Sequence, residues 1–128
     1  LSIALVVDVS GSCTQWFSLW QSLANELVEE VENITRIEVV YHHHVHCFTD
    51  TWNRGDGEIE LECNQSGGTC HKEALAEVET LDVDAIIQFT DNETYWPETF
   101  PEQDCITVRC PYSRELCPFG VNVDATIQ

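Results

Sequence analysis

The feature that most constrains the fold is the opening of the chain, where an apolar run ends abruptly in a short polar loop. Residues 1–7 are apolar and rich in β-branched side chains, and residues 8–12, Asp-Val-Ser-Gly-Ser, follow them directly. Such a run, ending at a Ser/Gly turn, is typical of a strand buried on both faces of a parallel sheet. The helical period that follows places the polar residues on a strand-to-helix loop, where open α/β sheets bind ligands.

This polar loop offers ligands for a hard divalent cation. The carboxylate of Asp8 and the hydroxyls of Ser10 and Ser12 are spaced so that all three can turn toward one point. Ligands that are all oxygen atoms suit Mg²⁺ or Mn²⁺. The same residues also suit a Ser-rich turn that caps the following helix, so this stretch alone leaves both interpretations open.

Composition limits the classes of function. We expect one domain over residues 1–128, with no apolar run near the roughly 20 residues that a membrane helix needs. The formal net charge of −18 argues against nucleic acid or an anionic membrane as a partner and is compatible with binding cations. The first residues do not resemble a signal peptide. Seven cysteines, an odd number, favour a reducing compartment such as the cytoplasm, although three Asn-X-Ser/Thr sequons would suit a secreted protein.

The rest of the chain alternates between helix and strand patterns. Residues 15–31 have apolar side chains at helical spacing, so we expect a long amphipathic helix whose tryptophans pack in the core. Residues 36–41 begin a second strand, parallel to the first across a right-handed crossover. We expect an antiparallel edge strand at residues 58–62, in a hairpin that turns at residues 55–57. The remaining predicted elements are a helix at residues 73–80 and strands at residues 84–90, 105–110 and 121–127.

The second strand continues into a histidine-rich stretch, residues 42–48. Because side chains alternate along a strand, His42, His44 and His46 would share one face and offer ligands for Zn²⁺. Residues four apart on a strand lie about 13 Å apart, however, which is too far for one ion without outside ligands. We interpret these histidines as packing or hydrogen-bonding residues, and a zinc enzyme built on them remains an alternative.

Two other short patterns have simpler explanations. Cys105, Cys110 and Cys117 offer part of a thiolate zinc site, but their spacing is not that of paired CxxC knuckles, so buried free thiols are the simpler interpretation. Residues 54–56, Arg-Gly-Asp, spell the integrin-recognition tripeptide at the tip of the expected hairpin. Turn chemistry alone explains Gly and Asp at that place.

Two further segments bring oxygen ligands toward the opening loop. Residues 65–70 contain two glycines, and Thr69 there precedes the short helix, where it can also act simply as an N-cap. Asp91 follows the buried strand at residues 84–90, at the point where that strand leaves the sheet. Since the carboxyl ends of parallel strands meet at one edge of a sheet, we expect the ligands to converge. The candidate metal ligands are Asp8, Ser10, Ser12, Thr69 and Asp91.

These segments together resemble the metal-ion-dependent adhesion site of von Willebrand factor A (VWA) domains. The resemblance rests on three segments, in this order: residues 8–12 (Asp-Val-Ser-Gly-Ser), 67–69 (Gly-Gly-Thr) and 89–91 (Phe-Thr-Asp). It covers nearly the whole chain, and residues 118–120, Pro-Phe-Gly, are similar to those before the last strand of compact bacterial and phage VWA-like domains. Two residues depart from that pattern: Cys70 replaces an Asp, and Asn92 stands where a Gly often follows the last acid.

The resemblance implies a Rossmann-like, doubly wound α/β fold with a mostly parallel sheet and one antiparallel edge strand. It also implies that Ser10 and Ser12 coordinate Mg²⁺ or Mn²⁺ directly. Thr69 would bind directly or through water, and Asp8 and Asp91 mostly through bound waters. Such an ion keeps an open position for an Asp or Glu of a protein partner, so a binding module rather than an enzyme is expected. For the compact group, the implied partner is an AAA+ ATPase or a larger assembly.

Two further alternatives stay open. A Mg²⁺-dependent phosphohydrolase of the haloacid dehalogenase type needs a second carboxylate two residues after its nucleophile, where this chain has Ser10, and a Lys in a matching loop. A VWA-like scaffold that binds no metal is favoured by the departures at Cys70 and Asn92. Neither a Ser-His-Asp order nor a phosphate-cradling Gly loop with Lys is present in the sequence.

Overall fold

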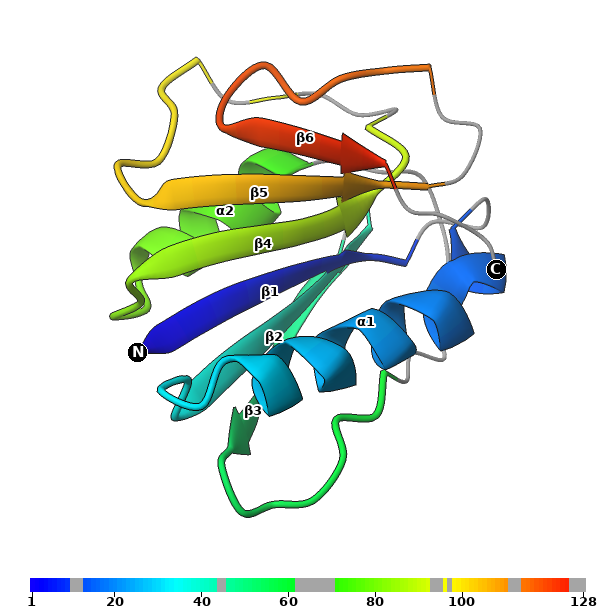
Figure 1. The fold of residues 1–128 in the computed structure, drawn as a ribbon. Helices are drawn as coiled ribbons and strands as arrows, with labels where there is room; N and C mark the ends of the chain where they lie inside the picture. The colour runs from blue at the N-terminus through cyan, green and yellow to red at the C-terminus, as the bar shows by residue number, and fades with distance from the viewer. Residues whose placement is uncertain are drawn as a thin grey trace.

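A six-stranded sheet with helices on both faces forms the centre of the fold. The computed structural model describes residues 1–9, 13–43, 46–61, 71–92, 96, 98–110 and 114–124. Its elements are β1 (Ser2–Asp8), the 3-10 turn η1 (Thr14–Trp16), α1 (Phe17–Glu30), β2 (Arg36–His43), β3 (His46–Asn53), α2 (His71–Glu79), β4 (Ala85–Thr90), β5 (Asp104–Arg109) and β6 (Val121–Asp124). The strand order is β3-β2-β1-β4-β5-β6, and only the β2–β3 pair is antiparallel. α1 and α2 cover opposite faces (Figure 1), so the predicted doubly wound α/β fold is confirmed.

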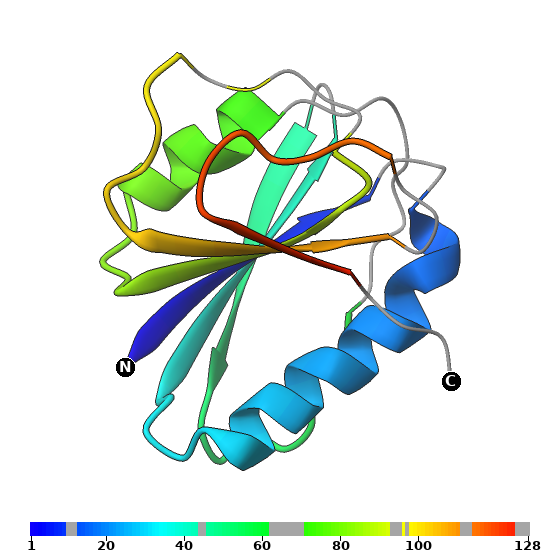
Figure 2. The ribbon, with the colours of Figure 1, turned by 45° about the horizontal axis from the view of Figure 1, so that its top comes forward.

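β1 is buried on both faces, as its apolar run predicts. Leu5 and Val7 pack in the core that α1 covers, whereas Ala4 and Val6 pack in the core that α2 covers. All four side chains are at most 1% exposed. The turned view in Figure 2 shows the two helices on either side of the sheet. Because both cores depend on β1, its carboxyl end is held in place from both sides.

α1 turns a tryptophan toward the sheet, in agreement with the predicted amphipathic helix. Its buried residues are Trp20, Ala24 and Val28. The indole ring of Trp20 is stacked on the ring of Phe89 in β4, with ring centroids 5.4 Å apart. This aromatic pair joins α1 to the last part of β4, immediately before the chain leaves the sheet.

The antiparallel edge strand lies earlier in the chain than predicted. β3 pairs with β2, and His43 stands opposite His46, so the chain reverses between them. The prediction of one continuous strand through the histidine stretch is therefore wrong. The side chain of His46, which the zinc alternative needs, lies outside the described part of the chain. Residues 58–61 belong to no strand, so the edge strand predicted at residues 58–62 is wrong over this range. His44 and residue 62 lie outside the described residues.

The segment that follows β3 packs against α1 instead of joining the sheet. Ile59 and Leu61 are 2% and 5% exposed, which explains their alternating pattern. The side chain of Asn25 donates to the carbonyl of Ile59 at 2.9 Å and accepts its N–H at 2.7 Å. Gln21 accepts the N–H of Leu61 at 2.9 Å. Side-chain amides of the helix thus take the place of a neighbouring strand.

Arg54 closes the same segment onto the end of α1. Its guanidinium donates to the carbonyl oxygens of Ile34 at 2.7 Å, Val28 at 2.9 Å and Val31 at 3.1 Å. The bond to Val28 satisfies a carbonyl that the last turn of α1 leaves without a helical partner, and the other two bonds hold the chain just after the helix. The arginine of the Arg-Gly-Asp tripeptide is thus bound to its own chain, which supports the turn interpretation of residues 54–56.

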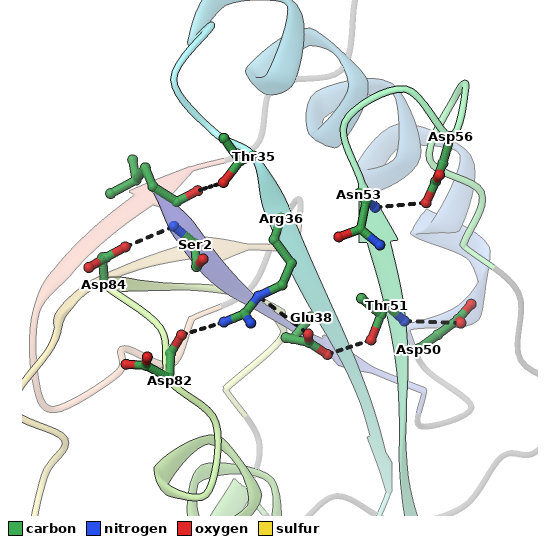
Figure 3. Close-up of polar contacts among 11 residues, drawn as sticks. Ser2, Thr35, Arg36, Glu38, Asp50, Thr51, Asn53, Asp56, Asp82 and Asp84 are labelled. Carbon is green, nitrogen blue, oxygen red and sulfur yellow. Dashed lines mark hydrogen bonds and ion pairs between the residues drawn. The ribbon is translucent and has the colours of Figure 1, made fainter.

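Polar contacts hold the amino-terminal edge of the sheet together (Figure 3). The N–H of Ser2 donates to a carboxylate oxygen of Asp84 at 2.8 Å. The guanidinium of Arg36 forms an ion pair with Glu38 at 3.5 Å and donates to the carbonyl of Asp82. These contacts connect the first residues of β1 and β2 to the loop before β4. They tie the amino-terminal ends of the three strands together at the edge of the sheet opposite to Asp8.

The remaining predicted elements are confirmed within small shifts of their bounds. α2 corresponds to the helix predicted at residues 73–80, and β4, β5 and β6 to the last three predicted strands. β6 ends at Asp124, and residues 125–128 lie outside the described part of the chain. No helix among the described residues has the length and apolar character needed to cross a membrane.

Candidate metal centre

The carboxyl ends of β1 and β4 bring two acidic side chains together. The two strands are parallel neighbours with Val7 opposite Phe89, so Asp8 and Thr90 lie at the same level one residue further on. Asp91 follows as the chain leaves the sheet. Asp8 is fully buried and Asp91 is 9% exposed. Two of the five predicted ligands therefore meet at the edge where they were expected.

A third donor, the thiol of Cys13, lies with these two acids. One carboxylate oxygen each of Asp8 and Asp91 and the sulfur of Cys13 all lie within 4.8 Å of one another, and all three residues are buried. Two carboxylates this close repel each other when both are ionised, and burial raises the cost of each charge. A cation between them offsets their repulsion and part of the cost of burial. The chemistry of this donor set therefore fits a divalent cation.

Thr90 holds the carboxylate of Asp8 in position. Its hydroxyl donates to Oδ2 of Asp8 at 2.8 Å and accepts the backbone N–H of Asn92 at 3.0 Å. The same oxygen thus fixes both the acid on β1 and the turn after β4. Thr90 does not stand out in the sequence as a functional residue. Its place directly before Asp91, at the end of the strand next to β1, is the signal that could have identified it.

Asn92 allows the chain to turn away from the sheet at this point. Its φ is +63°, in the left-handed region that favours glycine and that asparagine tolerates better than most residues. Its side-chain amide donates to the carbonyl of Glu115 at 3.1 Å, which connects the turn to the loop before β6. Asparagine at position 92, where VWA domains often have a glycine, is thus compatible with a left-handed backbone at this position.

Cys13 begins the turn from the opening loop into the first helix. Its carbonyl accepts the N–H of Trp16 at 2.9 Å, and its sulfur lies 3.8 Å from the sulfur of Cys110 at the end of β5. Both cysteines are free thiols and at most 5% exposed. Sequence reasoning left Cys13 out of the ligand set, although its position directly after Ser12 placed it beside the metal loop.

The three cysteines near the end of the chain do not gather. Cys110 packs in the core on the α1 side, whereas Cys105 packs in the core on the α2 side. The side-chain amide of Gln88 donates to Cys105 at 3.4 Å and to Cys117 at 3.6 Å. Burial raises the pKa of the Cys105 thiol to about 11, and repulsion from Cys117 adds to the rise. All three are buried free thiols, as the sequence analysis preferred.

The other predicted ligands, Ser10, Ser12 and Thr69, lie outside the described residues, as does Cys70. Their contribution to the site stays a prediction. The loop that carries the two serines begins at Val9, whose N–H donates to the carbonyl of His42 at 2.9 Å. The loop therefore leaves the sheet from the edge at which Asp8 and Asp91 meet.

Comparison with known proteins identifies the fold. No model of a known protein family matches the sequence, and no curated protein matches it. Among solved structures, the chain is similar to the crystal structure of the ArnB paralog VWA2 from Sulfolobus acidocaldarius, with a TM-score of 0.64 and 17% sequence identity. The fold is VWA-like. The similarity covers 88% of this chain and 35% of that one, so the chain spans about a third of the length of that protein. The VWA-like fold expected from the sequence motifs is thereby confirmed, and metal binding at its carboxyl edge stays a prediction.

Proposed function

We propose that this chain is a divalent-metal-dependent protein-binding module, not an enzyme, and that it binds an acidic side chain of its partner. The resemblance of the sequence motifs to those of VWA domains suggests a role in protein interactions. The observation that carries the proposal is the meeting of Asp8 and Asp91, both buried, at the carboxyl edge of the sheet. That edge is where open α/β sheets bind their ligands.

The proposed site combines the two acids with three hydroxyls. Asp8 and Asp91 would hold Mg²⁺ or Mn²⁺ together with Ser10, Ser12 and Thr69. When bound, the ion supplies an electrophilic position that a carboxylate can fill. The residues of this chain orient that position: Thr90 fixes the Asp8 carboxylate, and the Asp8–Asp91 pair sets the negative charge around it. Neutral hydroxyls as direct ligands would leave more of the ion's charge for the partner.

Electrostatics makes the proposed binding strictly dependent on metal. With a net charge of −18, the chain repels an acidic partner at long range. Attraction to a carboxylate therefore has to come from a local positive charge at the site. The resemblance to compact VWA-like domains suggests an AAA+ ATPase or a larger assembly as the source of that carboxylate, and the surrounding loops would select among partners.

Thermal melting in Mn²⁺ and in EDTA tests metal binding. We expect Mn²⁺ and, less strongly, Mg²⁺ to raise the melting temperature, because an ion that binds only the folded state stabilises it by mass action. Asp8→Asn and Asp91→Asn should abolish the rise. Asp50→Asn, which removes one exposed carboxylate from the edge strand, should keep it. Equal melting curves with and without metal would favour the metal-free scaffold instead.

A carboxylate probe tests the open position. Acetate added to the Mn²⁺-loaded protein should displace water from the ion and lower the relaxation rate of water protons, whereas acetamide should not. An acetate response that persists in Asp91→Asn would place the ion elsewhere. Turnover of a generic phosphoester that is lost in Asp8→Asn would support the phosphohydrolase alternative.

A further inference from the structure

We propose that Cys13 is a metal ligand, and that Asp8, Cys13 and Asp91 together bind Zn²⁺ in preference to Mg²⁺. The inference rests on the proposed function in one respect, since it uses the same two acids. It differs from that function in the type of ion and in the sulfur ligand. None of the residues that match the VWA motif is a cysteine, so the resemblance does not suggest it.

The geometry brings three different ligand atoms to one place. Two carboxylate oxygens and one sulfur lie within 4.8 Å of one another, from β1, the residue before η1 and the residue after β4. Ligand atoms of a tetrahedral zinc ion with two oxygens and one sulfur lie about 3.3–3.7 Å apart, as follows from Zn–O bonds near 2.0–2.2 Å and Zn–S bonds near 2.3 Å. Small side-chain rotations suffice to close the remaining difference.

The chemistry of the sulfur favours zinc. Mg²⁺ takes six oxygen ligands and gains nothing from a thiolate, whereas Zn²⁺ binds Cys, His and carboxylate ligands in four-coordinate sites. Zn²⁺ also stands far above Mn²⁺ in affinity for a common ligand set. A cysteine that served only as apolar packing would gain nothing from two carboxylates beside its sulfur. Three protein ligands leave a fourth position open, as in zinc sites that bind an external ligand.

Cys110 acts as a positioning residue for Cys13. Its sulfur lies 3.8 Å from that of Cys13, but it does not belong to the group of three atoms that lie close together. The two sulfurs are far from the roughly 2.05 Å of a disulfide and share a thiol hydrogen bond instead. Such a contact orients the ligand sulfur in the way that outer partners orient the ligands of known metal sites.

Cobalt substitution tests the sulfur ligand directly. The full chain is titrated with Co²⁺, followed by displacement with Zn²⁺. Bound Co²⁺ should show an intense sulfur-to-cobalt charge-transfer band in the wild type. Cys13→Ser should lose the band and bind Zn²⁺ at least about 10–100-fold more weakly, while its stabilisation by Mn²⁺ persists. Cys110→Ser should keep the band but shift it, with affinity about 10-fold lower. Cys105→Ser, the matched change in the core on the α2 side, should behave as the wild type.

Several outcomes would overturn the inference. They are a wild-type protein without the charge-transfer band, a Cys13→Ser protein that binds Zn²⁺ as tightly as the wild type, and a band that survives in the Asp8→Asn, Asp91→Asn double variant. The first outcome needs no variant, and the third uses only the two Asp→Asn changes, so the inference can be overturned even if Cys13→Ser and Cys13→Ala fail to fold. Failure of the proposed function looks different: neither Mn²⁺ stabilisation nor the acetate response would be seen, although the cobalt band is present.

Discussion

The hydroxyl of Thr90 is the smallest group on which the geometry of the site depends. It donates to the buried carboxylate of Asp8 and accepts the N–H of Asn92. We expect Thr90→Val to lower stability by about 1–3 kcal/mol, because it leaves a buried acceptor and a buried N–H without this partner. We also expect Mn²⁺ affinity to fall by about 10–100-fold, since the acid loses its orientation. Urea denaturation and Mn²⁺ titration measure the two effects.

The matched control is Thr107→Val on β5. The hydroxyl of Thr107 is also fully buried and accepts the side-chain amide of Gln88 at 3.0 Å, on the α2 side of the sheet. Thr107→Val should lower the free energy of unfolding by a comparable amount and leave the Mn²⁺ affinity unchanged. If Thr90→Val binds Mn²⁺ as the wild type does, the orienting role assigned to Thr90 is wrong.

The buried thiol of Cys105 makes the stability of the fold depend on pH in the alkaline range. Burial and the neighbouring Cys117 raise its pKa from an ordinary 9.0 to about 11. The folded state therefore keeps a proton that the unfolded chain releases, so this contribution is complete below pH 9 and is lost as the pH rises toward 11. Urea midpoints measured across this range should fall, and Cys105→Ala should show a flatter profile. Parallel profiles for the two proteins would contradict the assignment.

At the scale of elements, hydrophobic pattern predicted burial better than it predicted the partner of each segment. The unbroken apolar run of β1 can be satisfied only between two layers, so its place in the sheet followed from the sequence. The alternating pattern at Ile59 and Leu61 correctly indicated that this segment is buried on one side. The side chains of Gln21 and Asn25 on α1, however, supply the hydrogen bonds that a neighbouring strand would have supplied. Such long-range side-chain partners leave no local signal.

Gly120 lies in the turn directly before β6, and its backbone conformation allows β6 to join the sheet. Its φ is +69°, and a Cβ at this position would lie 2.3 Å from the carbonyl oxygen of Cys105. We expect Gly120→Ala to lower stability by about 2–4 kcal/mol, because both backbone strain and steric overlap act there. Gly55→Ala isolates the strain: its φ is +104° and a Cβ there meets nothing within 4 Å. If Gly120→Ala and Gly55→Ala lose the same stability in urea denaturation, the steric overlap at position 120 relaxes without cost.

In the whole molecule, the sequence predicted that Asp8 and Asp91 meet at one edge of the sheet, but not that Cys13 and Thr90 lie beside them. Asp8 and Asp91 meet because parallel strands end at one edge, a consequence of fold class alone. Cys13 and Thr90 were missed because their contacts with the two acids depend on distances of a few ångströms between segments up to 82 residues apart. The turn between β2 and β3 was missed because the histidine stretch carries no glycine or proline to mark it.

The most direct test of the account is a crystal structure of this chain grown with Mn²⁺, with anomalous diffraction used to locate the ion. The central claim is that oxygen ligands from separate segments meet around one cation at the carboxyl edge of the sheet. We expect an anomalous peak beside the carboxylates of Asp8 and Asp91. A structure at saturating Mn²⁺ with no peak there, or with the peak at another acidic cluster, would contradict it.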